Sequence, residues 1–141
     1  MSKNAQLMKI LLVEDSIADI ELTLDALSEA KVANEVAVER DGAAAIRYLQ
    51  DPSKDLPDLV ILDLNLPRMT GHEVLAAMRS HDAMRRIPVA VLTTSSAEAD
   101  VAKTYDLGAN CFLTKPVDVD QFVHVVQSID DFWLGLVRLP Q

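Results

Sequence analysis

Two short apolar runs of the sequence end in acidic residues. Glu14 and Asp15 follow the run MKILLV, and Asp63 follows the run LVIL. Three carboxylates brought together repel one another, and a hard divalent cation such as Mg²⁺, which prefers oxygen ligands, relieves that repulsion. The residue types therefore predict a metal site, provided that the fold brings the two runs together.

Polar residues also follow two later apolar runs. Thr93 follows IPVAVL, and Lys115 stands between the run CFL and Pro116. A lysine ammonium at this point would complement a bound phosphoryl group, and a threonine hydroxyl can donate a hydrogen bond to one of its oxygens. Each residue alone also fits an ordinary role, as a helix cap, a surface lysine or a β-branched strand residue. It is the occurrence of these residues together, at the ends of four apolar runs, that indicates a functional site.

The elements that would position these residues can be predicted from the alternation of short apolar runs with longer segments of helical period. This alternation is typical of βαβ units and a parallel sheet, whose carboxyl ends share one edge. The sequence predicts five strands and five helices, with the strands at Met8–Val13, Glu35–Glu39, Leu59–Leu62, Ile87–Leu92 and Cys111–Leu113.

Helix starts are marked by capping boxes, in which the side chains of two residues three apart each accept from the other's N–H. Asp41 can cap the helix that lacks such a box, and Gly108 stands where the fourth helix would need a left-handed stop. The four boxes are Ser16 to Asp19, Thr70 to Glu73, Ser95 to Glu98 and Asp118 to Gln121.

Composition limits the classes of function. The chain of 141 residues fits a single domain, and its net charge of -9 argues against nucleic acid and anionic membranes as partners. Cys111 cannot form an internal disulfide, the first residues lack the apolar run of a signal peptide, and no stretch reaches the ~18 apolar residues of a membrane span. We expect a cytoplasmic protein.

The ordered set of Glu14, Asp15, Asp63, Thr93 and Lys115 followed by proline resembles the receiver domain of two-component response regulators, from Met8 to about Val137. The resemblance implies a doubly wound, flavodoxin-like α/β fold with a five-stranded parallel sheet in the order 2-1-3-4-5. Residues 1–7 would form an N-terminal tail and residues 8–141 the receiver domain with an extended C-terminal helix.

The resemblance also implies the chemistry. Asp63 would accept a phosphoryl group from a sensor histidine kinase. Asp15 and Asp63 would bind Mg²⁺ directly, the main-chain carbonyl of Asn65 would be a third protein ligand, and Glu14 would act through water. The protein would catalyse its own modification, so we expect a phosphoryl acceptor and not an enzyme acting on a separate substrate.

Switch residues follow from the same resemblance. Lys115 would pair with the phosphoryl oxygens and form a cis bond to Pro116, Thr93 would be the switching hydroxyl, and Phe112 the switching aromatic residue.

Longer stretches, such as VILDLNLPRMTGHEVL and the tail FWLGLVRLP, are similar to the single-domain regulators that partner phytochrome histidine kinases. This similarity implies a phytochrome-type kinase as the partner. Because the sequence shows no DNA-binding or enzymatic domain after the fifth helix, we expect signalling by protein contact. A downstream protein target, a phosphorelay intermediate and a phosphate sink all remain open.

Other classes of protein fit less well. A flavodoxin-like electron carrier needs a Gly/Ser/Thr-rich phosphate loop after the first strand, where this chain has EDSIAD. A phosphatase of the acid-nucleophile type places a paired aspartate motif on the first strand, whereas Asp63 follows the third. A degenerate receiver used for docking would not need the full acidic set.

An apolar stripe at helical spacing runs from Phe122 to Val137, and the predicted sheet can cover only about three turns of it. The remainder would be exposed unless it folds back on the core, so we expect a homodimer through this part of the chain. The residues assigned to the interface are Phe132, Trp133, Leu136 and Val137.

Overall fold

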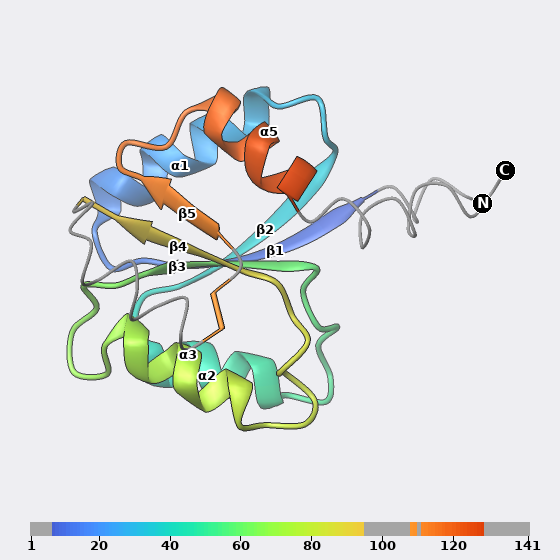
Figure 1. The fold of residues 1–141 in the computed structure, drawn as a ribbon, viewed down its shortest axis with the longest axis vertical. Helices are drawn as coiled ribbons and strands as arrows, with labels where there is room; N and C mark the ends of the chain where they lie inside the picture. The colour runs from blue at the N-terminus through green and yellow to red at the C-terminus, as the bar shows by residue number, and fades with distance from the viewer. Residues whose placement is uncertain (1–6, 95–107, 110, 129–141) are drawn as a thin grey trace, which may run out of the picture.

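A computed structural model of the chain describes residues 7–94, 108–109 and 111–128. Its centre is a five-stranded parallel sheet in the order β2-β1-β3-β4-β5, which confirms the predicted fold class and strand order (Figure 1). The strands are β1 (Met8–Val13), β2 (Asn34–Glu39), β3 (Leu59–Asp63), β4 (Val89–Thr93) and β5 (Cys111–Thr114).

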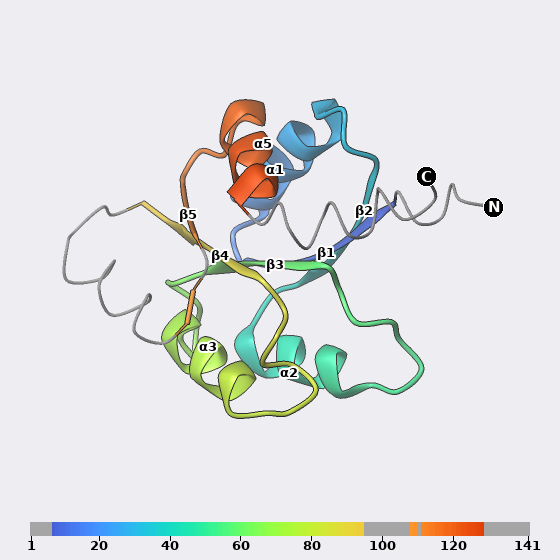
Figure 2. The same cartoon turned by 45° about the vertical axis from the view of Figure 1, so that its right-hand side comes forward.

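Helices cover both faces of the sheet (Figures 1 and 2). The pair α1 and α5 lies on one face, and the pair α2 and α3 lies on the other. Within the described residues the helices are α1 (Ile17–Glu29), α2 (Gly42–Gln50), α3 (Gly71–Arg79) and α5 (Val119–Ser128). None of them combines the length and apolarity needed to cross a membrane. The helix expected after Ser95, most of the N-terminal tail and the end of the C-terminal helix lie outside the described residues.

The core explains why the three central strands are almost wholly apolar. Every residue of β3 and β4 is buried, because helices cover both faces. Side chains alternate between the faces, so Leu11 and Leu62 pack toward α2 and α3, while Leu12 and Ile61 pack toward α1 and α5. Burial on both sides fixes the strands firmly, and with them the residues at their carboxyl ends.

The ends of four of the five strands differ from the sequence prediction. β2 begins at Asn34 and not at Glu35, and β4 and β5 each end one residue later than predicted, at Thr93 and Thr114. β4 begins at Val89 and not at Ile87, because Ile87 N–H donates to the carbonyl of Met84 within the preceding turn and Pro88 has no N–H. β3 extends to Asp63, which pairs with Leu92. The acidic residue is therefore the last residue of the buried strand and not the first residue of the loop.

The helix starts agree with the predicted caps in part. Thr70 and Glu73 form the complete capping box, and Asp41 accepts from Ala44 N–H at the start of α2. Ser16 forms half of its box, since its Oγ accepts from Asp19 N–H at 3.2 Å, but its own N–H donates elsewhere. The Asp118 box is also half formed.

Candidate functional site

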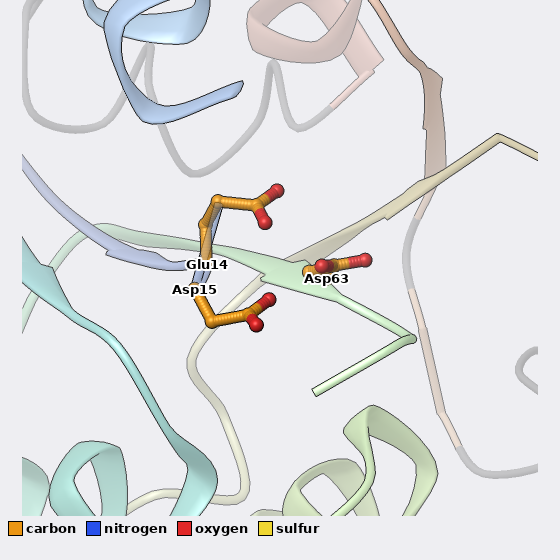
Figure 3. A group of neighbouring side chains, drawn as sticks. All are labelled: Glu14, Asp15 and Asp63. Carbon is orange, nitrogen blue, oxygen red and sulfur yellow. The ribbon is translucent and has the colours of Figure 1, made fainter. Parts of the chain in front are cut away.

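Three carboxylates meet at the carboxyl edge of the sheet, as the strand order requires. Glu14 and Asp15 follow β1, Asp63 ends the adjacent β3, and one carboxylate oxygen from each lies within 4.8 Å of the other two. Figure 3 shows the three side chains beside one another at the strand ends. Glu14 and Asp63 are buried, with 0% and 1% of their surface exposed, whereas Asp15 is half-buried.

Lys115 reaches this cluster from the end of β5. Its Nζ lies 2.9 Å from Glu14 Oε1, 2.9 Å from Asp19 Oδ2 and 3.2 Å from Asp63 Oδ2. Its backbone N–H donates to the carbonyl of Thr93 at 3.0 Å, and the peptide bond to Pro116 is cis, as predicted. The strand end therefore places one ammonium among carboxylates of β1, α1 and β3.

Burial and charge act in opposite directions on the ionisation of this group. Burial lowers the pKa of Lys115, but hydrogen bonds to Glu14 and Asp19 and the negative charges of Asp63 and Glu14 outweigh it, and the net pKa is raised. Burial raises the pKa of Glu14, against the opposing effect of its hydrogen bonds with Lys115 and Ser16 N–H. Lys115 therefore stays charged at neutral pH. The carboxylates of the cluster repel one another.

The backbone after Asp63 is tightly held. Asn65 N–H donates to Asp63 Oδ1 at 3.1 Å, and Leu64 N–H donates to the carbonyl of Leu92. A Cβ on Gly71 would lie 2.4 Å from the carbonyl oxygen of Asp63, so α3 can begin here only because residue 71 is glycine. Asn65 is exposed two residues beyond the acid, and the metal-binding role of its carbonyl stays a prediction.

The two predicted switch residues lie on neighbouring strands. Thr93 is the last residue of β4, is 4% exposed and pairs with Thr114 of β5. Phe112 is half-buried on β5 and packs against the apolar cluster on the face of α2 and α3. The structure brings Thr93 close to Lys115 through the backbone bond, while the switching roles of both residues stay predictions.

Two neighbours of the site were not expected from the sequence. Asp19 was assigned to a helix cap, yet its carboxylate pairs with Lys115. Arg40 donates to the main-chain carbonyl of Asp15 at 2.8 Å. The position of Asp19 in the first turn after β1 was a usable signal for a site residue, whereas nothing local in the sequence marks Arg40.

The cluster fits a hard divalent cation. The ammonium of Lys115 contacts the carboxylates of Glu14, Asp19 and Asp63, and the carboxylate of Asp15 lies beside those of Glu14 and Asp63. Among these five groups, four negative charges face one positive charge, so excess negative charge remains. Carboxylate oxygens are the ligands that Mg²⁺ and similar ions take. The donor set thus agrees with a metal at this position.

The predicted interface residues Phe132, Trp133, Leu136 and Val137 lie outside the described residues.

Comparison with known proteins gives a consistent result. The profile of the response regulator receiver domain matches residues 10–127. Response regulator Rcp1 of Synechocystis sp. is 44% identical over 135 residues, which span 93% of this chain and 92% of Rcp1. The Mn²⁺-bound structure of Rcp1 superposes with a TM-score of 0.73 at 44% identity, and the alignment covers 90% of this chain and 94% of Rcp1.

Two further solved structures are similar. The bacteriophytochrome response regulator RtBRR has a TM-score of 0.79 at 46% identity over 87% of this chain and 78% of that chain. The phosphorylated cyanobacterial phytochrome response regulator RcpA has a TM-score of 0.74 at 45% identity over 91% and 94% of the two chains. The residues matched by the family profile contain β1 except for its first two residues, all of β2, β3, β4 and β5, and the described acidic cluster. The chain belongs to the response regulator receiver domain family.

Proposed function

We propose that Asp63 accepts a phosphoryl group from a sensor histidine kinase in a Mg²⁺-dependent reaction, and that the modification switches a protein-interaction surface. The observation that carries this proposal is the placement of the Asp63 carboxylate. It is buried at a strand end, 3.2 Å from Lys115 Nζ, and it shares a carboxylate cluster with Glu14 and Asp15.

The reaction needs a carboxylate nucleophile and a means of offsetting negative charge. An oxygen of Asp63 attacks phosphorus, the bond from phosphorus to the kinase histidine nitrogen breaks, and the nitrogen keeps the bonding electron pair and takes up a proton. Lys115 is placed to offset charge on the transferred group, because its ammonium already contacts Asp63. The chain thus modifies itself and turns over no separate substrate.

Four groups of the chain would hold the cation. Asp15, Asp63 and the main-chain carbonyl of Asn65 would bind it directly, and Glu14 would bind through water. When bound, the cation offsets negative charge on the carboxylates and the phosphoryl oxygens. The Mn²⁺-bound structure of the relative Rcp1 supports a divalent ion in this family, and we propose Mg²⁺ for this chain.

The response would pass from the site to the surface through Thr93 and Phe112. Thr93 is buried and directly follows Leu92, which pairs with Asp63, and its hydroxyl would donate to a phosphoryl group on Asp63. Phe112 lies half-buried on the neighbouring strand, where a change in its packing would alter the exposed face. Signalling would then proceed by contact with another protein.

A phytochrome-type histidine kinase is the proposed partner in a cytoplasmic setting, without nucleic acid or membrane. The support is the similarity to RtBRR and RcpA, whose names connect them with phytochromes. We also propose a homodimer through Phe132, Trp133, Leu136 and Val137, argued from the apolar stripe of the sequence.

Phosphotransfer from purified kinases tests the proposal. A phytochrome histidine kinase labelled on its histidine should pass the label to this chain faster than an unrelated histidine kinase does, and Asp63→Asn should accept none. Equal rates from both kinases would contradict the proposed partner. Undiminished labelling of Asp63→Asn would contradict the proposed acceptor.

A further inference from the structure

Asp19 occupies an unusual place for an acid in the first turn of a helix. It is the third residue of α1, and its N–H donates to Ser16 Oγ in the manner of a capping box. In a complete box the acid would accept from the Ser16 N–H in return. That N–H instead donates to Glu14 Oε2 at 3.1 Å, so the carboxylate of Asp19 is left available and binds Lys115.

Comparison with α3 makes the difference plain. There Thr70 and Glu73 form both halves of the box, and the Glu73 carboxylate accepts from Thr70 N–H at 2.8 Å. The same local motif therefore holds its acid at the helix start in α3 and turns its acid toward the site in α1. The Asp19 carboxylate thus belongs to the charged cluster around Lys115 and not to the cap.

Lys115 has three carboxylate neighbours and donates hydrogen bonds to two of them, to Asp19 Oδ2 at 2.9 Å and to Asp63 Oδ2 at 3.2 Å. A lysine ammonium has three N–H groups and no acceptor, and Lys115 Nζ lies within 3.2 Å of three carboxylates, those of Glu14, Asp19 and Asp63. A phosphoryl oxygen next to Asp63 would compete for the ammonium with these carboxylates, and two of them, Asp19 and Asp63, already accept a hydrogen bond from it.

The burial of each carboxylate determines which of them can lose its contact with Lys115 at the lowest cost in free energy. Glu14 is 0% exposed, and an unpaired charge in such a place carries a large desolvation penalty. The side chain of Asp19 is 31% exposed, so water can replace the lysine as its partner. Asp63 is the acceptor itself and stays next to the group that it receives.

We infer that Asp19 is the releasable partner of Lys115: it holds the ammonium at the exposed side of the carboxylate cluster while Asp63 is unmodified, and competes with the phosphoryl group for it. Asp19 is thus a positioning residue that acts through Lys115 and lowers the affinity of the site for a phosphoryl group. This inference rests on the proposed role of Asp63 as the acceptor.

Beryllofluoride, a mimic of the phosphoryl group, tests the inference by calorimetric titration in saturating Mg²⁺. Asp19→Asn keeps an acceptor oxygen but removes the charge, and we expect it to bind beryllofluoride about fivefold more tightly than the wild type. Asp19→Ala should also bind more tightly. The gain should shrink at high salt, since a partly exposed charge is screened. A purely structural role would not produce that dependence.

Asp25→Asn is the matched control, because it removes one exposed carboxylate from the same helix away from the pocket. We expect it to bind as the wild type does. Unchanged affinity in both Asp19 variants would mean that the phosphoryl group takes the place of Asp63 on Lys115, and would overturn the inference. Weaker binding would overturn it too, since Asp19 would then be a support for Lys115. Equal binding by wild type and Asp63→Asn would instead contradict the proposed function.

Discussion

Lys115 is the residue on which the electrostatics of the pocket depend. Replacement by methionine would leave the buried carboxylates of Glu14 and Asp63 without their cation. We expect Lys115→Met to lower the free energy of unfolding by about 2–4 kcal/mol in metal-free buffer, because removing one partner of a buried ion pair leaves an uncompensated charge. Urea unfolding with a chelator present measures the loss. Lys54→Met, at an exposed lysine, is the control and should change little.

The pH dependence of that loss follows from Glu14. Burial raises the pKa of Glu14, and an acid whose folded-state pKa is raised makes the protein less stable as pH rises above the ordinary value of the group. Without Lys115 this effect should grow. The difference between wild type and Lys115→Met should therefore shrink as pH falls from neutrality to about pH 4.5, near the ordinary value for glutamate. A difference that widens toward low pH would contradict this explanation.

Most of these residues could be predicted from the sequence because each stands at the carboxyl end of a strand or directly after it. Asp63 and Lys115 were identified in this way, and the structure places them in contact. Asp19 was missed as a site residue because an acid three positions after a serine is explained by a helix cap. Which acceptor the Ser16 N–H finds depends on where Glu14 points, and a local pattern does not contain that information.

At the scale of elements, the junction between β3 and α3 holds the acceptor in place. A methyl group on residue 71 would lie 2.4 Å from the Asp63 carbonyl oxygen and 2.7 Å from Leu64 Cα, and these backbone atoms cannot turn aside. We expect Gly71→Ala to destabilise the fold by about 1–3 kcal/mol, as overpacked substitutions do, and to slow phosphorylation of Asp63. Thermal unfolding and acetyl phosphate labelling measure the two effects.

Thr70→Ala separates helix stability from the geometry of the site. It removes the cap of α3 and should cost about 1 kcal/mol, but it adds no atom near Asp63. Labelling of its folded form should match that of the wild type. If Thr70→Ala slowed labelling as much as Gly71→Ala does, loss of stability alone would explain both.

The ends of β4 and β5 should separate chemistry from signalling. Thr93→Ala removes a buried hydroxyl that is not a nucleophile, so the variant should still be phosphorylated on Asp63. It should lose the phosphorylation-dependent change in partner binding, since a modification shifts a two-state equilibrium only through contacts that differ between the states. Pull-down with the phosphorylated variant measures this loss. If partner binding by Thr93→Ala still depended on phosphorylation, Thr93 would not be part of the switch.

Element types were more predictable than element ends. The five apolar runs gave the strands and their order through the family resemblance, whereas the start of β4 was misplaced because the turn at Ile87 depends on a hydrogen bond to Met84. Nothing in the local sequence marks Arg79 as a residue that joins distant segments. It donates to the carbonyls of Gly108, Arg85 and Ile87, and contacts across up to 29 residues leave no local pattern.

For the whole molecule, the sequence predicts association between copies of the chain. The described part of α5 buries Phe122, Val125 and Val126 against the sheet, and the apolar spacing continues into Phe132 and Trp133. We expect the chain to be a dimer at tens of micromolar protein, since an isologous homodimer is the commonest way to cover such a patch. We also expect the double variant Phe132→Ala with Trp133→Ala to sediment as a monomer. A wild-type monomer with and without beryllofluoride would exclude the dimer.

We propose above that the fold presents one carboxylate, that of Asp63, for phosphorylation beside a divalent cation. Labelling with a small phosphoryl donor tests this directly. Acetyl phosphate should add a single phosphoryl group to the intact protein in Mg²⁺, as measured by mass, and peptide mapping should place it on Asp63. Asp82→Asn, which alters an exposed acid, should be labelled like the wild type. Asp63→Asn, and wild type with a chelator, should stay unlabelled. Labelling of Asp63→Asn at the wild-type level, or labelling that does not need a divalent cation, would contradict the claim.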